Sequence, residues 1–236
     1  MIFVHIGAGA GDLDPKVNYR DGFSELVKNH ESKIKKIYVV EANPINIKKL
    51  KKCWKKYKAV KIFNFAIVSN RINKKKIKFY YSVKDAPHYQ LFSTDINHIK
   101  RNLPDSKIKN TTIKTMKIMD FMKKNFTKKI IESFSIDVEG GDFDIIMSLD
   151  FKKYNIQNIS LEYLHLNVIE KKKILRKLIK NGYSYNGFGV DHNNIDWSFK
   201  KKINNWNNWV SKLMPFIHRK HYKRLNKLLI NKKNIN

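Results

Sequence analysis

The pattern of apolar and polar positions predicts strands that alternate with helices. Apolar or alternating runs of strand length, bounded by turn-forming residues, lie at residues 2–6, 37–40, 60–68, 77–83, 111–116, 133–138, 158–166, 183–189 and 196–199. Helical periodicity predicts helices at 44–57 and 168–181, and a short helix that begins at Asp120. This alternation is typical of an α/β fold with a mostly parallel sheet. The last two runs flank a turn at 191–194 and predict an antiparallel hairpin at the sheet edge.

Two stretches interrupt this pattern and divide the chain. Residues 84–110 lack clear periodicity and include His88, and a long irregular insertion in a compact domain is typical of a lid or substrate-binding loop. We therefore predict one domain over 1–200, with a lid at 84–110. Residues 201–236 form a separate basic and aromatic tail.

The tail combines apolar side chains at helical spacing with a following run of lysines. Its aromatic and aliphatic members are Trp206, Trp209, Leu213, Phe216 and Ile217. An aromatic face beside a basic one predicts a helix that lies on an anionic membrane surface. The alternative is that the aromatic side chains pack on the domain while the lysines are solvated.

Length and composition are those of one globular domain. The chain has 236 residues, of which 42% are hydrophobic, enough to bury a core. No apolar run approaches the roughly 18 residues that span a bilayer, and the chain starts with a strand, so we expect a cytoplasmic protein. Cys53 stands alone and is interpreted as structural, because a disulfide or a cysteine metal cluster needs partners.

The formal charge of +29 raises the question of a polyanionic partner. Only six of the 49 basic residues are arginine, and the lysines are spread along the whole chain. Specific readers of phosphates and bases favour the bidentate fork of arginine. The composition therefore favours a solvated lysine surface over a nucleic-acid interface.

A glycine cluster and a distant acid form the first candidate site. The segment IFVHIGAGAGD carries an apolar strand directly into Gly7, Gly9 and Gly11, and a second apolar run ends in Glu41. A strand, a glycine turn, a helix and a strand with a terminal acid form a βαβ unit, whose loop backbone can approach a ligand and whose carboxylate can accept two ribose hydroxyls. The pattern predicts a pocket for a nucleoside cofactor. The spacing departs from the dinucleotide GxGxxG fingerprint, and a flexible turn after a parallel strand is the alternative.

A second cluster of polar residues follows the predicted strand at 133–138. It comprises Asp137, Glu139 and a Gly140–Gly141 pair, and a later strand carries Glu162 and His165. Ligands bind outside the carboxyl ends of parallel strands. We therefore expect the glycine loop, Glu41, Ala66 and Asp137 to lie along one edge of the sheet.

Taken in order, these motifs resemble the FkbM-type S-adenosylmethionine-dependent methyltransferases over roughly residues 2–199. The segments that carry the resemblance are IGAGAGD, VVEANP, NFAIVS, SIDVEGGDFDIIMSLDF, SLEY and NGYSY, of which DVEGGD is the most specific. The resemblance implies a Rossmann-like class I methyltransferase fold, with a mostly parallel seven-stranded sheet, a C-terminal antiparallel hairpin and helices on both faces. It also implies methylation of a hydroxyl on a sugar or small metabolite, with S-adenosylmethionine as the donor.

The resemblance also assigns roles to the residues that match the family motifs. Gly7, Ala8 and Gly9 match the loop around the methionine part of the cofactor, and Asp12 joins them. Glu41 matches the acid on the ribose, and Ala42 and Asn43 follow it beside the adenine. Phe65 and Ala66 match the strand end that flanks the adenine ring, and Asp137 matches the acid near the methionine amino group.

Methyl transfer to an alcohol requires a base within hydrogen-bond reach of the hydroxyl. The candidates are Asp137, Glu162, His165 and His88, and the residues alone do not choose among them. A divalent metal held by Asp137, Glu139 and Glu162 is the less favoured alternative, because carboxylates alone are weak evidence and no zinc-ligand spacing is present.

Two other functions compete with the methyltransferase. One is a basic module without turnover that keeps the Rossmann scaffold and binds nucleic acid or an anionic membrane surface. The other is an NAD-linked oxidoreductase, which the missing GxGxxG and the late acid disfavour. We expect a small-molecule or glycan acceptor for the methyltransferase, and the sequence leaves the oligomeric state open.

Overall fold

The computed structural model describes residues 1–11, 22–86, 89, 91–138, 140–188 and 196–201. Three predicted site residues, Asp12, His88 and Glu139, lie outside the described residues. The C-terminal segment predicted to lie on a membrane also lies outside them.

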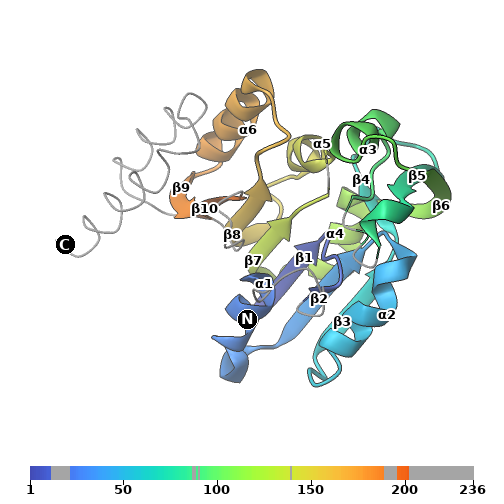
Figure 1. Ribbon diagram of the computed structural model, residues 1–236. Helices are drawn as coiled ribbons and strands as arrows, with labels where there is room; N and C mark the ends of the chain where they lie inside the picture. Colours follow the sequence, from blue (N-terminus) through green and yellow to red (C-terminus); the bar gives the residue numbers. More distant parts are fainter. Residues whose placement is uncertain (12–21, 87–88, 90, 139, 189–195, 202–236) are drawn as a thin grey trace.

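Seven strands form one twisted sheet (Figure 1). In spatial order they are β3 (Val60–Asn64), β2 (Lys36–Glu41), β1 (Ile2–Ile6), β7 (Ile130–Ile136), β8 (Asn155–Glu162), β10 (Asp196–Lys201) and β9 (Tyr183–Phe188). The first five run parallel, whereas β10 is antiparallel to both of its neighbours. The predicted Rossmann-like sheet with a C-terminal antiparallel hairpin is confirmed.

Helices cover both faces of this sheet because the side chains of its central strands alternate between two apolar cores. Phe3 of β1 belongs to a core with buried residues of α1 (Gly22–Lys28) and α2 (Pro44–Cys53). Its neighbour Val4 belongs to the opposite core, to which three further helices contribute. These helices are α4 (Ile118–Phe126), α5 (Asp142–Ser148) and α6 (Val168–Lys180).

A second, smaller sheet lies beside the first and departs from the strand pattern of the sequence. It has the order β4 (Ala66–Val68), β6 (Ile108–Lys117) and β5 (Lys76–Ser82). The single strand predicted at 60–68 is therefore two strands, because the chain leaves the main sheet at Phe65 and β4 pairs with β6 instead. Apolar periodicity continues through the break and gave no sign of it.

The segment 84–110, predicted to be a lid, has structure of its own in its described part. It contains the short helix α3 (Ile96–Asn102), which lies against β5. Upstream of α3, the ring of Phe92 stacks on Phe79 of β5 at a centroid distance of 4.7 Å, and Ser93 forms a bridge with Tyr80. The segment therefore extends the small sheet. Closure over a ligand stays a prediction.

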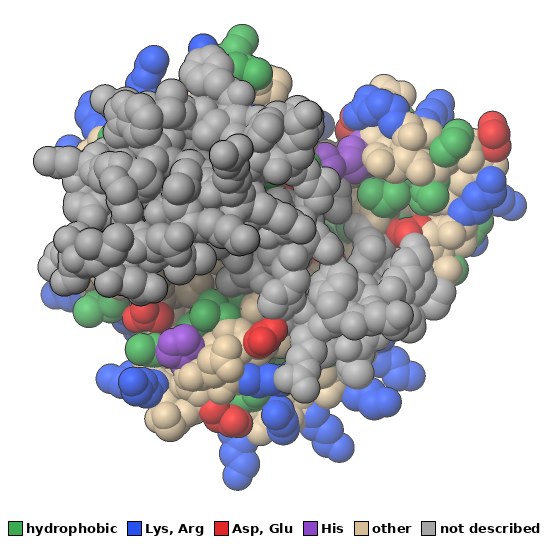
Figure 2. Space-filling model, turned by 60° about the vertical axis from the view of Figure 1, so that its left-hand side comes forward, with side chains coloured by type: hydrophobic (Ala, Val, Ile, Leu, Met, Phe, Trp, Pro, Cys, Tyr) green, Lys and Arg blue, Asp and Glu red, His purple; other side chains and the backbone are tan. Residues whose placement is uncertain are grey.

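Short 3-10 turns complete the described elements, η2 (Glu31–Lys33) before β2 and η3 (Val83–Asp85) after β5. On the face drawn in Figure 2, Lys and Arg side chains project around the periphery and acidic side chains are few. None of the helices in the described part of the chain is long and apolar enough to cross a bilayer.

Candidate functional site

The glycine loop is held between the carboxyl ends of β2 and β7. The backbone N–H of Gly7 donates to the carbonyl of Val40 at 2.9 Å, and the N–H of Asp137 donates to Ile6 at 2.9 Å. Gly7 has a φ of +84°, and a Cβ added there would lie 1.5 Å from the carbonyl oxygen of Asp137. Only glycine can occupy this position, so the loop and the end of β7 approach each other more closely than any side chain allows.

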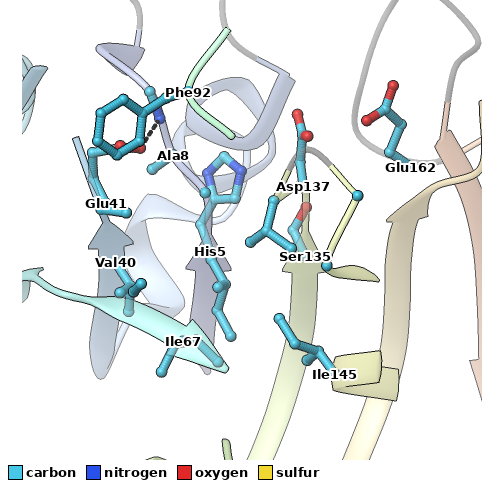
Figure 3. Close-up of a pocket in the computed structure, with 18 of the residues that line it drawn as sticks. His5, Ala8, Val40, Glu41, Ile67, Phe92, Ser135, Asp137, Ile145 and Glu162 are labelled. Atoms are coloured by element: carbon cyan, nitrogen blue, oxygen red, sulfur yellow. Dashed lines mark hydrogen bonds between the residues drawn. The ribbon is translucent and has the colours of Figure 1, made fainter. Parts of the chain in front are cut away.

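Glu41 ends β2 with its carboxylate turned toward the glycine loop. The N–H of Gly9 donates to Oε2 at 2.7 Å (Figure 3). The N–H of Asn43 donates to Oε1 at 2.5 Å. Glu41 is only 6% exposed, yet it lines a cavity. A carboxylate has about four lone-pair sites, so each oxygen of Glu41 can accept a further hydrogen bond from a ligand.

Burial has the largest effect on the pKa of the Glu41 carboxyl. It raises the pKa of Glu41 to about 7, while the backbone N–H groups of Asn43, Gly9 and Ala42 act in the opposite direction because they stabilise the ionised form. Additional hydrogen-bond donors from a ligand would favour the ionised form further.

Asn43 and Asn46 connect the segment 84–110, here called the insertion, to the start of α2. The side chain of Asn43 caps the helix by accepting from the N–H of Ile45 at 3.0 Å, and it donates to the carbonyl of Tyr89 at 3.1 Å. Asn46 donates to the same carbonyl at 3.3 Å. Asn43 is fully buried and does not itself line the cavity, whereas Tyr89 does. The residue predicted beside the adenine thus holds the insertion in place.

An apolar wall stands beside Glu41. Phe65 and Ala66, predicted to flank an adenine ring, both line the cavity, as does Ala42. Phe92 of the insertion lines it as well and is drawn above Glu41 in Figure 3. Aromatic and aliphatic surfaces of this kind bury a flat apolar ring favourably.

One cavity of about 510 Å³ joins these groups to the carboxyl ends of β7 and β8 and to the amino end of β10. Its volume lies in the range of small-molecule sites. Its acidic lining residues are Glu41, Asp137, Asp144, Glu162 and Asp196. Among the described residues that line it, none is Lys or Arg. The described wall of the cavity therefore carries acidic side chains and no Lys or Arg, although the protein as a whole is strongly basic.

Three of these acids lie at the adjacent ends of the neighbouring strands β7, β8 and β10. Glu162 of β8 is the direct partner of Asp196 across the antiparallel pair with β10. On the other side of β8, Ile136 pairs with Leu161, so Asp137 and Glu162 each follow a paired position. Figure 3 shows the carboxylates of Asp137 and Glu162 on the same side of the sheet. We call Asp137, Glu162 and Asp196 the carboxylate row.

Behind the carboxylate row, two histidines connect β8 to the insertion. His165 Nε2 lies 3.1 Å from Glu162 Oε2, which is ion-pair distance, although Oε2 has no hydrogen-bond partner of adequate geometry in the described structure. The ring of His165 meets that of His98 in α3 edge to face at 4.9 Å. Glu162 lines the cavity and His165 does not. Of these two candidate bases, Glu162 has direct access to the cavity, and which residue acts as the base stays a prediction.

The floor of the cavity contains polar residues that the sequence motifs did not indicate. His5 and Ser135 are paired across β1 and β7, and both line the cavity. Ser135 is 1% exposed, and within the described residues its Oγ has no hydrogen-bond partner. Both residues precede predicted site residues by two positions, so strand alternation could have found them. Asp196 begins a predicted strand, but its pairing with Glu162 required the register.

The metal hypothesis receives no support from the described residues. Their His, Cys, Asp and Glu side chains include no group of three or more that could hold a metal ion. Glu139, one of the three proposed ligands, lies outside the described part of the chain.

Comparison with known proteins places these features in context. Residues 5–185 match the family of the Methyltransferase FkbM domain. A structure of Methyltransferase FkbM from Methylobacillus flagellatus is similar at 11% identity and a TM-score of 0.47, covering 84% of this chain, which spans 42% of that one. A structure of a putative RNA methyltransferase from Pyrococcus horikoshii is similar at 10% identity and a TM-score of 0.39. The match covers 86% of this chain and 74% of that one. No curated protein matches the chain.

Proposed function

The chain belongs to the FkbM methyltransferase family, and we propose that it transfers a methyl group from S-adenosylmethionine to a hydroxyl oxygen of a sugar or other small molecule. The observation that carries this proposal is Glu41, whose carboxylate is bonded to Gly9 of the glycine loop inside the cavity. An acid and a glycine turn on adjacent parallel strands can hold the ribose and the amino-acid part of one nucleoside cofactor.

The residues present suit this cofactor in charge and shape. When bound, S-adenosylmethionine supplies a methyl group on a sulfonium, which becomes a neutral thioether as the methyl leaves. The acidic cavity, with no Lys or Arg among its described lining residues, favours a ligand that carries a sulfonium and an ammonium charge. Glu41 would accept hydrogen bonds from the ribose hydroxyls, and Asp137 would pair with the ammonium group. Phe65 and Ala66 would cover the adenine ring.

Glu162 is the favoured base for the acceptor. It lies in the cavity near the end of β8, whereas His165 stands behind it, 3.1 Å from its Oε2. In the proposed reaction the acceptor oxygen forms a bond to the methyl carbon and its proton passes to Glu162. His165 holds that carboxylate in position. Proton removal is needed because a neutral alcohol is a poor nucleophile.

Two measurements test the proposal in sequence. Calorimetric titration with S-adenosylhomocysteine should give saturable heat with one site, and Glu41→Gln should weaken it. Transfer of labelled methyl groups to a panel of sugars and amino sugars should then depend on Glu162, with Glu162→Gln inactive while it still binds S-adenosylhomocysteine. An absence of cofactor heat in the folded wild type would reject the enzyme and favour the alternative of a basic binding module.

A further inference from the structure

A cluster of exposed aliphatic side chains follows the Glu162 end of the cavity. Leu164 lies in the loop between β8 and α6, and Val168 and Ile169 are the first two residues of α6. They are 40%, 48% and 64% exposed, and they make up three of the five exposed large hydrophobic residues in the described part of the chain. Single exposed aliphatic residues are normal, but a cluster rimmed by polar residues is typical of an interaction surface.

Basic side chains continue this surface along α6. From Ile169 the exposed face of the helix runs through three exposed basic residues at helical spacing, Lys173, Arg176 and Lys180. The opposite face is apolar and packs into the main core. The single acid of α6 is Glu170, whose side chain accepts from the N–H of Asn167 at 3.0 Å and closes a capping box. The surface is therefore aliphatic beside the cavity and basic along the rest of the helix.

We call this set of residues the α6 surface: Leu164, Val168, Ile169, Lys173, Arg176 and Lys180. Its composition distinguishes among three kinds of partner. Protein interfaces are depleted in lysine and enriched in aromatic residues, and readers of nucleic acids favour arginine. The α6 surface has one arginine and no aromatic side chain. Aliphatic side chains beside lysines are typical of surfaces that lie on anionic bilayers, because the aliphatic groups enter the headgroup region while the lysines attract the lipid charge.

We propose that the α6 surface docks on an anionic lipid bilayer. Val168 and Ile169 enter the headgroup region, and Lys173 and Arg176 pair with lipid phosphates. The formal charge of +29 favours the approach of the whole protein to such a bilayer. Docking in this way places the Glu162 end of the cavity beside lipid headgroups. The inference concerns the domain itself and not residues 201–236, and it does not depend on the proposed function.

The test measures co-sedimentation of the full chain with lipid vesicles, so that residues 201–236 are present in every variant. Vesicles of phosphatidylglycerol and phosphatidylcholine in equal parts should bind the wild type about tenfold or more tightly than vesicles of phosphatidylcholine alone. Ile169→Gln should weaken binding to the anionic vesicles by about fivefold to tenfold, because an amide replaces an aliphatic group that enters the bilayer. Lys173→Gln should weaken it by about fivefold.

Ile130→Gln and Lys58→Gln are the matched controls. Ile130 is 58% exposed at the start of β7, and Lys58 is exposed just before β3, so both lie at the edge of the sheet opposite the cavity. Both variants should bind the anionic vesicles as the wild type does. Denaturant unfolding of all four variants should give midpoints close to that of the wild type, because each replaced side chain is exposed.

Three results would overturn the inference. They are a wild type that binds neither kind of vesicle, equal vesicle binding by the wild type and Ile169→Gln, and equal losses in Ile169→Gln and Ile130→Gln. Binding of a random single-stranded RNA in place of vesicles, weakened by Lys173→Gln but not by Ile169→Gln, would assign the surface to nucleic acid instead. Calorimetry with S-adenosylhomocysteine tests the proposed function separately, because neither Ile169 nor Lys173 lines the cavity.

Discussion

Two carboxylates at opposite ends of the cavity are held in contrasting ways. Both oxygens of Glu41 accept hydrogen bonds from main-chain N–H groups. Glu162 instead faces Asp196 across the sheet and, within the described residues, has a histidine beside its Oε2. Main-chain donors are part of the fold and do not titrate, so the Glu41 end is organised before any ligand arrives. Under the proposed function, the acceptor would complete the Glu162 end.

The largest expected effect is that of a substitution at Gly7, in the glycine loop beside Glu41. Gly7→Ala should lower the free energy of unfolding by roughly 3 kcal/mol or more, because its Cβ would overlap the carbonyl of Asp137 and backbone atoms cannot move aside cheaply. Denaturant unfolding measures this loss.

Gly182→Ala is a control that has the cost of a positive φ without a steric overlap of the added Cβ. Gly182 has a φ of +81° but nothing lies within 4 Å of its added Cβ, so this variant should lose only about 1 to 2 kcal/mol. Equal losses in the two variants would show that the close approach of the loop to Asp137 is not what requires glycine.

The next effect should appear at Glu41. Glu41→Gln places an amide NH₂ against one of the two N–H donors, Gly9 or Asn43, and removes the charge that a ribose would use. Affinity for S-adenosylhomocysteine should fall by about 1.5 to 3 kcal/mol, a factor of ten or more, in calorimetric titration. Asp105→Asn, which removes a charge from an exposed residue outside the cavity, should not change it. Unaltered binding by the Gln variant would mean that the ribose lies elsewhere.

The raised pKa of Glu41 predicts that cofactor binding depends on pH. If the bound form is ionised and the free pKa is about 7, affinity for S-adenosylhomocysteine should fall by about fivefold from pH 7 to pH 6, and Glu41→Gln should remove this dependence. Without ligand the sign is reversed: the contribution of Glu41 to folding is fully present below its unfolded pKa and is lost as pH rises toward 7. A wild-type affinity that stays flat over this interval would contradict the assignment.

The smallest expected effect is that of a substitution at Asp196, at the Glu162 end of the cavity. Asp196→Asn should raise the free energy of unfolding of the ligand-free protein by up to about 1 kcal/mol, since it removes repulsion with Glu162 and keeps an oxygen for Ser160. Asp105→Asn makes the same change in net charge on an exposed loop and serves as the reference. A loss of stability specific to the Asp196 variant would show that the pair is structural.

The local sequence was sufficient to predict most of the main sheet but failed at two places, the break between β3 and β4 and the helix α3. The strands β1, β2 and β7 are apolar runs bounded by turns, so their positions followed from periodicity. The run at 60–68 was predicted as one strand because nothing within it marks the point where the chain changes sheets. The helix α3 was missed because it has seven residues, of which His98 and Ile99 are buried against other elements. Tertiary packing overrides weak local signals of this kind.

The glycine loop and Glu41 could be recognised from the chain alone, since a βαβ unit brings its own turn and its own strand end together. The pairing of Glu162 with Asp196, the contact of His98 with His165 and the orphan hydroxyl of Ser135 emerged only from the fold. Each depends on the register or docking of elements far apart in the sequence, and a shift of one residue in β10 would turn Asp196 to the other face of the sheet. Neighbouring residues therefore determined the glycine loop and Glu41, whereas the grouping of residues from distant strands was decided only by the tertiary structure.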